Sequence, residues 1–177
     1  MPGPRSTAPD DRRRGDGADS TMMFSTKAEY GVRVMAHLAR ETGDASGNGA
    51  PGEPIPLGSI ADSEQLPLAY LEHLVQRLRR AELVDSRRGA HGGYTVSRPA
   101  DSITMAEVVE ALEGDIAPIE CISAQDDGTL VCSREAQTAR VCPTKVLWTR
   151  VQGSIVRTLK DITLSELVVP NRKKATV

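Results

Sequence analysis

Residues 68–96 read LAYLEHLVQRLRRAELVDSRRGAHGGYTV and combine two apolar periodicities in one stretch. In the first half, apolar residues recur every three or four positions, which predicts an amphipathic helix from Leu68 to about Ala81. In the second half, apolar and polar residues alternate on either side of a glycine-rich connection, which predicts a β-hairpin. A helix followed directly by such a hairpin is the order found in a winged helix-turn-helix.

The segments before this stretch supply the remaining helices of that motif. Ser25 or Thr26 is suited to cap a helix that continues through Leu38. A short helix is expected from Leu57 to about Ser63, just before the amphipathic helix. The short helix and the amphipathic helix would form the helix-turn-helix pair.

Two further helices are expected after the hairpin. Thr104 and Glu107 have the spacing of a capping box at the start of a helix that ends near Leu112. A long helix should begin near Pro143 and end near Asp161. An apolar stripe follows this long helix and consists of Trp148, Val151, Ile155, Leu159 and Ile162. The stripe predicts a homodimer formed through the helix, and packing against its own domain is the alternative.

The expected fold class is mainly α with a small β-hairpin wing: a winged helix-turn-helix domain plus a long C-terminal dimerisation helix. Polar, Pro-rich and Gly-rich sequence before Met22 predicts disorder there. The expected segments are a disordered tail (1–22), the winged domain (23–100), a linker helix with a cysteine-bearing loop (101–142), the dimerisation helix with a short terminal helix (143–168) and a flexible tail (169–177).

Composition limits the functional classes. The 177 residues contain no segment with the apolarity of a membrane span or a secretion signal, which predicts a cytoplasmic protein without a membrane partner. They also contain no paired carboxylates in a pocket-forming context, no phosphate-binding glycine loop before a helix and no nucleophile with an evident base. We therefore expect a protein that is not an enzyme.

Charge is distributed unevenly along the chain. The formal net charge is −2, yet six arginines lie between Arg77 and Arg98 against only Glu82 and Asp85. The next segment, residues 101–135, holds nine acids against one arginine. A module with this local excess of positive charge can bind phosphate despite an acidic total, although a solvated surface is the plain alternative.

The position of the arginines beside a helix-turn-helix favours double-stranded DNA as the partner. On the amphipathic helix, the residues expected near base edges are Ala69, Tyr70, Glu72 and His73. The residues expected at phosphates or a groove are Arg77, Arg80, Arg87, Arg88 and His91. A dimer would place two such surfaces on a palindromic operator.

Cys121, Cys132 and Cys142 lie within 22 residues that follow the fourth helix. In a reducing cytosol, three clustered thiols indicate metal binding or redox chemistry more than a disulfide framework. The residues alone leave several alternatives open: an iron site, zinc, a reversible disulfide switch or inert buried thiols. Zinc is the weaker of these because structural zinc sites usually show close cysteine pairs.

Several segments together resemble the winged-helix regulators that include IscR, NsrR and CymR. The matching segments are STKAEYGV (25–32), LAYLE (68–72), LRRAELV (78–84), RGAHGGY (88–94) and ITLSEL (162–167), within residues 22–168. Members with three cysteines at this place hold iron-sulfur clusters, while members without them act without a cluster. The resemblance implies a transcriptional regulator, with repression the expected action, that senses iron, redox state or nitric oxide.

The resemblance also implies ligands. Cys121, Cys132 and Cys142 would hold the cluster, with a 2Fe-2S form favoured over 4Fe-4S, and Glu29 of the partner subunit would be the fourth ligand. The sequence departs from its relatives in two ways: the gaps between cysteines are longer, and Lys145 stands where IscR has a histidine ligand. A cluster-free regulator controlled by thiol oxidation, or by binding a metabolic enzyme, is the alternative.

Overall fold

The computed structural model describes residues 24–42, 53–89, 91–117, 119, 121–125, 129–138 and 140–168. The expected tails, residues 1–22 and 169–177, lie outside this part of the chain. In the part that the structure describes, no helix has the length and apolarity needed to cross a membrane.

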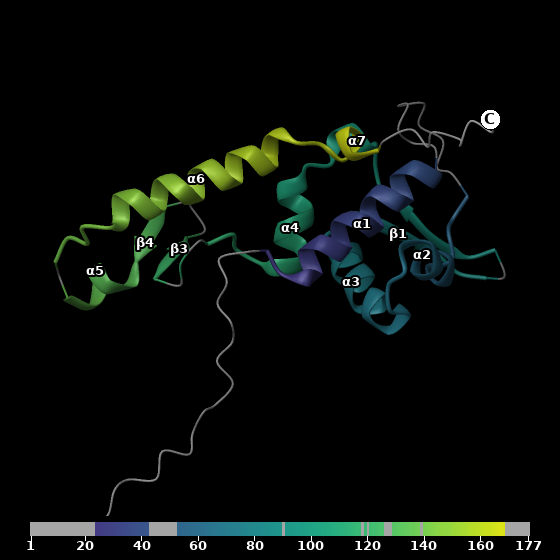
Figure 1. Cartoon of the computed structure of the whole chain (residues 1–177), viewed down its shortest axis with the longest axis horizontal. Coiled ribbons are helices and arrows are strands. Elements are labelled where there is room, and N and C mark those ends of the chain that lie inside the picture. Colours follow the sequence, from purple (N-terminus) through teal and green to yellow (C-terminus); the bar gives the residue numbers. More distant parts are fainter. Residues whose placement is uncertain are drawn as a thin grey trace, which may run out of the picture.

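The elements form a helical body from which an arm extends (Figure 1). In chain order they are α1 (Thr26–Glu41), α2 (Leu57–Glu64), α3 (Leu68–Arg80), β1 (Val84–Arg87), β2 (Gly93–Val96), η2 (Ala100–Ser102), α4 (Met105–Glu113), β3 (Ile122–Ala124), β4 (Leu130–Cys132), α5 (Ser133–Thr138), α6 (Lys145–Asp161) and α7 (Leu164–Leu167). The body comprises α1 to α4 with β1, β2 and α7. The arm comprises β3, β4, α5 and the first half of α6.

Helix α1 occupies the centre of the body and packs against α2, α3, α4 and α7. Its Val34, Met35 and Leu38 have no exposed surface, and burial of a side chain of this size contributes about 2 kcal/mol. Ser25 caps the helix, because its hydroxyl accepts a hydrogen bond from the Lys27 N–H at 3.1 Å. The predicted first helix is therefore present with the predicted cap.

Helices α2 and α3 with the β1–β2 hairpin form a winged helix-turn-helix. Helix α2 ends at Gln65 in the left-handed conformation, and α3 follows directly. The apolar face predicted for α3 is confirmed, since its buried residues are Leu71, Leu74, Val75 and Leu78. The hairpin pairs Val84 with Val96 and Arg87 with Gly93 in an antiparallel register.

Helix α4 joins the body to the arm. The predicted capping box is present: the Thr104 hydroxyl accepts from the Glu107 N–H, and Glu107 accepts from the Thr104 N–H at 2.8 Å. The start of α4 is tied to the C-terminal segment, because the Met105 N–H donates to Ile162 O and the Leu164 N–H donates to Ile103 O. The C-terminal end of α6 is therefore held in the body, whereas its N-terminal end lies in the arm (Figure 1).

The cysteine segment is more ordered than the sequence predicted. The expected loop is in fact an antiparallel β3–β4 hairpin followed by the short helix α5. The strands form because Ile122 and Cys132 stand opposite each other and are both almost completely buried, which gives the hairpin its own small apolar side. The prediction of an irregular loop was wrong for these residues.

The apolar stripe of the last helix is divided between two environments. Ile155, Val156 and Leu159 pack against Ala28, Val109 and Ile116 of the same subunit. At the other end of α6, Val146 and Leu147 are exposed, as is Val141 just before the helix. Ile155 and Leu159 of the predicted stripe therefore pack on their own body, and the exposed apolar residues near the start of α6 are not members of that stripe.

Candidate DNA-binding surface and cysteine site

The outer face of α3 is polar and accessible. Ala69, Glu72 and His73 are exposed along its first two turns, and Arg80 is exposed at its last turn. Side chains at the start of a helix that enters the major groove can reach base edges, while a basic last turn suits phosphate. Helix α3 thus presents the expected combination of groups on one face.

Two residues of the expected DNA surface already have partners within the body. Tyr70 is half-buried, and its ring stands edge-on to Tyr30 of α1 with the ring centroids 5.7 Å apart. Arg77 Nη1 donates to Leu112 O at the end of α4 over 3.0 Å. The structure thus gives both side chains a packing or bonding role inside the subunit.

The wing carries three exposed residues that can meet phosphate: Arg87, Arg88 and His91. Its base is fixed by Ile55, which exchanges two backbone hydrogen bonds of 2.9 Å with Tyr94. This third backbone segment supports the short hairpin, which would be marginally stable alone. The wing therefore holds its basic tip at a defined place beside α3.

A buried ionic group connects α1 to the helix-turn-helix. His37 of α1 is 5% exposed, and its Nδ1 lies 2.9 Å from Glu64 Oε1 at the end of α2. Arg40 Nη2 lies 3.0 Å from the same ring nitrogen and 3.6 Å from the carboxylate. The two residues are 27 positions apart in the chain, so spacing in the sequence does not reveal their contact.

The β3–β4 hairpin brings the first two cysteines together. Cys132 lies at the end of β4, and the Ser133 N–H donates to Cys121 O at 2.9 Å. Cys132 is 1% exposed, whereas Cys121 and Cys142 are half-buried. All three are free thiols.

The three thiols interact with one another. Partial burial raises the pKa of Cys121, and the neighbouring thiols of Cys132 and Cys142 raise it further. The pKa of Cys142 is lowered, first by hydrogen bonds from the hydroxyl and N–H of Thr144, and also by a hydrogen bond with Cys132. Cys132 therefore interacts with both of the other thiols.

Glu135 of α5 positions the third cysteine. Its Oε1 accepts the Cys142 N–H at 2.8 Å, and its Oε2 lies 2.6 Å from Lys145 Nζ at the start of α6. These hydrogen bonds lower the pKa of Glu135, and the carboxylate in turn raises the pKa of Lys145. Lys145, which the sequence only excluded as a ligand, thus helps to hold Cys142 against α5.

The donor chemistry of this group suits iron-sulfur ligation, in which thiolates bind the irons. Within the described ranges, no three His, Cys, Asp or Glu side chains surround a point where a single metal ion could sit. A cluster spreads its cysteine ligands over several irons, so the three thiols fit a cluster better than a mononuclear zinc site.

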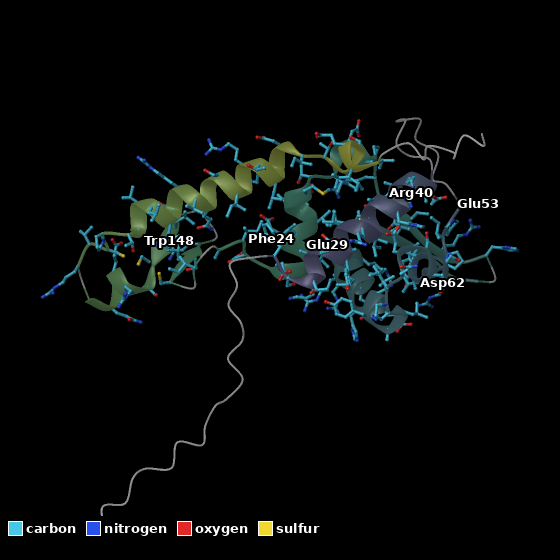
Figure 2. The ribbon with its side chains drawn as sticks, viewed as in Figure 1. Phe24, Glu29, Arg40, Glu53, Asp62 and Trp148 are labelled. Atoms are coloured by element: carbon cyan, nitrogen blue, oxygen red, sulfur yellow. The ribbon has the colours of Figure 1, made fainter. Side chains whose placement is uncertain are left out.

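Glu29 does not lie among the thiols of its own subunit. Figure 2 shows Glu29 on α1 in the body and Trp148 on the α6 segment of the arm. The Glu29 side chain is exposed, and its Oε1 accepts from Arg33 Nε at 2.8 Å. A role for Glu29 as ligand therefore depends on a second subunit, as the sequence analysis expected.

Comparisons with known proteins agree with this architecture. A family model described as "Rrf2: Iron-dependent Transcriptional regulator" matches residues 24–170. The HTH-type transcriptional regulator CymR of Bacillus subtilis (strain 168) is 35% identical over 146 residues, which cover 82% of this chain and 89% of CymR. The HTH-type transcriptional regulator IscR of Sodalis glossinidius is 34% identical over 147 residues, which cover 83% of this chain and 79% of IscR.

Among solved structures, T. potens IscR matches with a TM-score of 0.63 and 30% identity, covering 88% of this chain and 92% of that one. The match extends beyond the winged domain, and the family model likewise includes the cysteine hairpin and α6. This chain belongs to the Rrf2 family of transcriptional regulators.

Proposed function

We propose that this Rrf2-family regulator senses iron supply, redox state or nitric oxide through an iron-sulfur cluster held by Cys121, Cys132 and Cys142. The observation that carries the proposal is the placement of three free thiols on adjoining elements: the β3–β4 hairpin holds Cys121 beside Cys132, and Glu135 holds Cys142. When bound, the cluster would supply a redox-sensitive link between the thiolates, with the 2Fe-2S form favoured. Glu29 of the partner subunit is the proposed fourth ligand.

The protein's own residues prepare the ligand positions. The β3–β4 register fixes Cys121 and Cys132 relative to each other, and Glu135 fixes the backbone of Cys142. A cluster that joins the three thiolates would add a constraint between the hairpin, α5 and the start of α6, and loss of the cluster would remove it. The cysteine site can therefore change the conformation of the arm.

The proposed output is repression through binding of a palindromic operator by two copies of α3 and the wing. Dimerisation through the first half of α6 is supported by Val141, Val146 and Leu147, of which Val141 is 89% exposed. Apolar side chains gathered on one helix end mark an interaction surface. A two-fold dimer would place the two recognition helices about one turn of DNA apart.

A second candidate is a regulator controlled by thiol oxidation without a cluster. It is favoured by the neighbouring thiols of Cys121 and Cys132, and by the lowered pKa of Cys142, which increases its thiolate fraction. A disulfide between two of these cysteines would also change the arm. The chain is similar to both CymR and IscR, so control by a cluster and control by thiol oxidation are both compatible with its family.

The visible absorption spectrum of anaerobically purified protein, with its iron and acid-labile sulfide content, separates these candidates. Charge-transfer absorption together with stoichiometric iron and sulfide supports the cluster. A colourless protein without iron, whose mass decreases by two hydrogen atoms when an added mild oxidant forms a disulfide, supports the thiol switch and contradicts the cluster. Reconstitution with iron and sulfide under reducing conditions, tested in parallel on Cys132→Ala, excludes loss during purification.

A further inference from the structure

Arg77 differs from the other basic residues of α3 because its guanidinium binds within the subunit. Its Nη1 donates to Leu112 O at 3.0 Å. This carbonyl belongs to the last turn of α4, where carbonyl groups lack partners within the helix and the helix dipole is negative. A cation is favourable there on both counts.

The same turn of α4 is fixed from its other side by α1. Glu113 Oε1 accepts hydrogen bonds from the N–H and the hydroxyl of Ser25, and its Oε2 lies 3.3 Å from Lys27 Nζ. Leu112 packs so closely on Gly31 that a Cβ at this glycine would collide with Leu112 Cδ1. The end of α4 therefore has one defined position relative to α1. The Arg77–Leu112 hydrogen bond fixes α3 relative to that end of α4.

The chain continues from this turn towards the cysteine hairpin. Gly114 has a φ of +84°, a conformation that other residues rarely adopt, and it directs the chain away from α4. Ile116 is then buried with Val109 against Ile155 of α6. Cys121 lies only five positions after Ile116 in the chain, so the cysteine hairpin is close in sequence to the end of α4.

We propose that Arg77 is a positioning residue that couples the end of α4, and with it the cysteine hairpin, to the recognition helix, and that it does not contact phosphate. This role rests on the proposed use of α3 to read DNA. The sequence had placed Arg77 at phosphate or in a groove, with Arg80. The two arginines lie on the same helix three positions apart, so they can be tested as a matched pair.

The test compares Arg77→Gln, Arg77→Lys and Arg80→Gln with the unchanged protein by fluorescence anisotropy over a series of salt concentrations. Two probes are used: the duplex that the unchanged protein selects from a random pool, and a mixed-sequence duplex of equal length. Arg77→Gln should weaken binding of the selected duplex about tenfold, the effect of losing one charge-assisted hydrogen bond. Its salt slope on the mixed duplex should stay unchanged, and Arg77→Lys should recover part of the affinity because an ammonium can still donate to Leu112 O.

Arg80→Gln should lower the salt slope by about 0.9 on both probes, as expected for one lost phosphate contact. An equal decrease in slope for Arg77→Gln would overturn the proposal, and so would unchanged affinity for the selected duplex. Thermal unfolding of each variant shows whether the fold is retained. If Arg77→Gln does not fold, the comparison of Arg77→Lys with Arg80→Gln decides the question on the same criteria.

Hydrogen exchange provides a readout that does not depend on DNA. Arg77→Gln should increase amide exchange at the end of α4 and in residues 114–117, and Arg80→Gln should not. Unchanged exchange in both variants would contradict the coupling. If Arg80→Gln leaves the salt slope unaltered, the proposed DNA surface fails instead, and the exchange result alone decides the role of Arg77.

Discussion

Cys132 is the most enclosed of the three thiols, with 1% of its surface exposed. Its burial means that a thiolate there has little access to water, so the charge would need a metal partner. Cys121 and Cys142 are more accessible. This arrangement assigns Cys132 the central place in the proposed site and the other two the outer places.

Replacement of any one cysteine with Ala should abolish or strongly labilise the iron-sulfur chromophore, because two thiolates give too few protein bonds to hold it. Glu29→Ala should act more gently, since water or a small thiol can replace one oxygen donor, and should give faster cluster loss with an altered spectrum. Iron, sulfide and absorption are measured anaerobically, with Ser133→Ala on the same segment as control. Full iron and sulfide in a single cysteine variant would refute the ligand assignment.

Arg88→Ala should weaken DNA binding and lower the salt slope by about 0.9, because the exposed wing arginine is placed to contact one phosphate. The measurement is an anisotropy titration over several salt concentrations. Arg150→Ala, which removes an exposed arginine from α6, is the matched control and should leave the slope unchanged. An unaltered slope for Arg88→Ala would remove the wing from the proposed interface.

Helix α4 packs against α1, α3 and α6, and its last turn depends on an ionised side chain. Burial alone would raise the pKa of Glu113, but hydrogen bonds from Ser25 and Lys27 and the lysine charge outweigh it, so the pKa lies below its ordinary value. A carboxylate with a lowered pKa stabilises the fold above its ordinary pKa. That stability is lost as the pH falls through the folded value.

Glu113→Gln should therefore lower the free energy of unfolding by about 1 kcal/mol at neutral pH, the scale of a hydrogen-bonded charged group. The difference from the unchanged protein should disappear in acid, below the lowered pKa of Glu113. Urea denaturation at both pH values measures it, and Glu110→Gln on the exposed side of α4 is the control. A difference that persists in acid would show that the effect is one of shape and not of charge.

The first turn of α6 bears the surface that we expect a second subunit to cover. Val146→Asp combined with Leu147→Asp should place two charges in that interface and give monomers in sedimentation experiments. Lys160→Asp changes charge at an exposed position in the last turn of α6, away from this surface, and should leave the dimer intact. A dimeric double variant would mean that the subunits associate through another surface.

Local pattern was sufficient to predict α1 to α4, α6, the α4 capping box and the core face of α3, because these depend on neighbours within a few residues, whereas α5 was missed. The β3–β4 hairpin was missed because its strands are three residues each, too short to show an alternating pattern. The Arg77–Leu112 and Glu135–Cys142 bonds depend on tertiary placement, which sequence spacing does not encode. The three cysteines were found from sequence, but their mutual interaction required the structure.

At the level of the complete regulator, the body holds the proposed DNA surface, the arm holds the thiols, and α4 with α6 connects them (Figure 1). A change at the cysteines affects DNA binding only if the two conformations of the arm differ in how they position α3. The expected coupling between two such sites is on the order of tenfold in affinity. The DNA titration shows whether a change at the cysteines raises or lowers the affinity for DNA.

The most direct test is the DNA affinity of one anaerobic preparation before and after its iron is removed with a chelator. The selected duplex is titrated by anisotropy at fixed salt, and Cys132→Ala is treated in the same way. We predict that affinity of the unchanged protein shifts about tenfold when iron is lost, while the Cys132→Ala variant shows no shift. Equal affinity of the unchanged protein before and after iron removal would contradict the account.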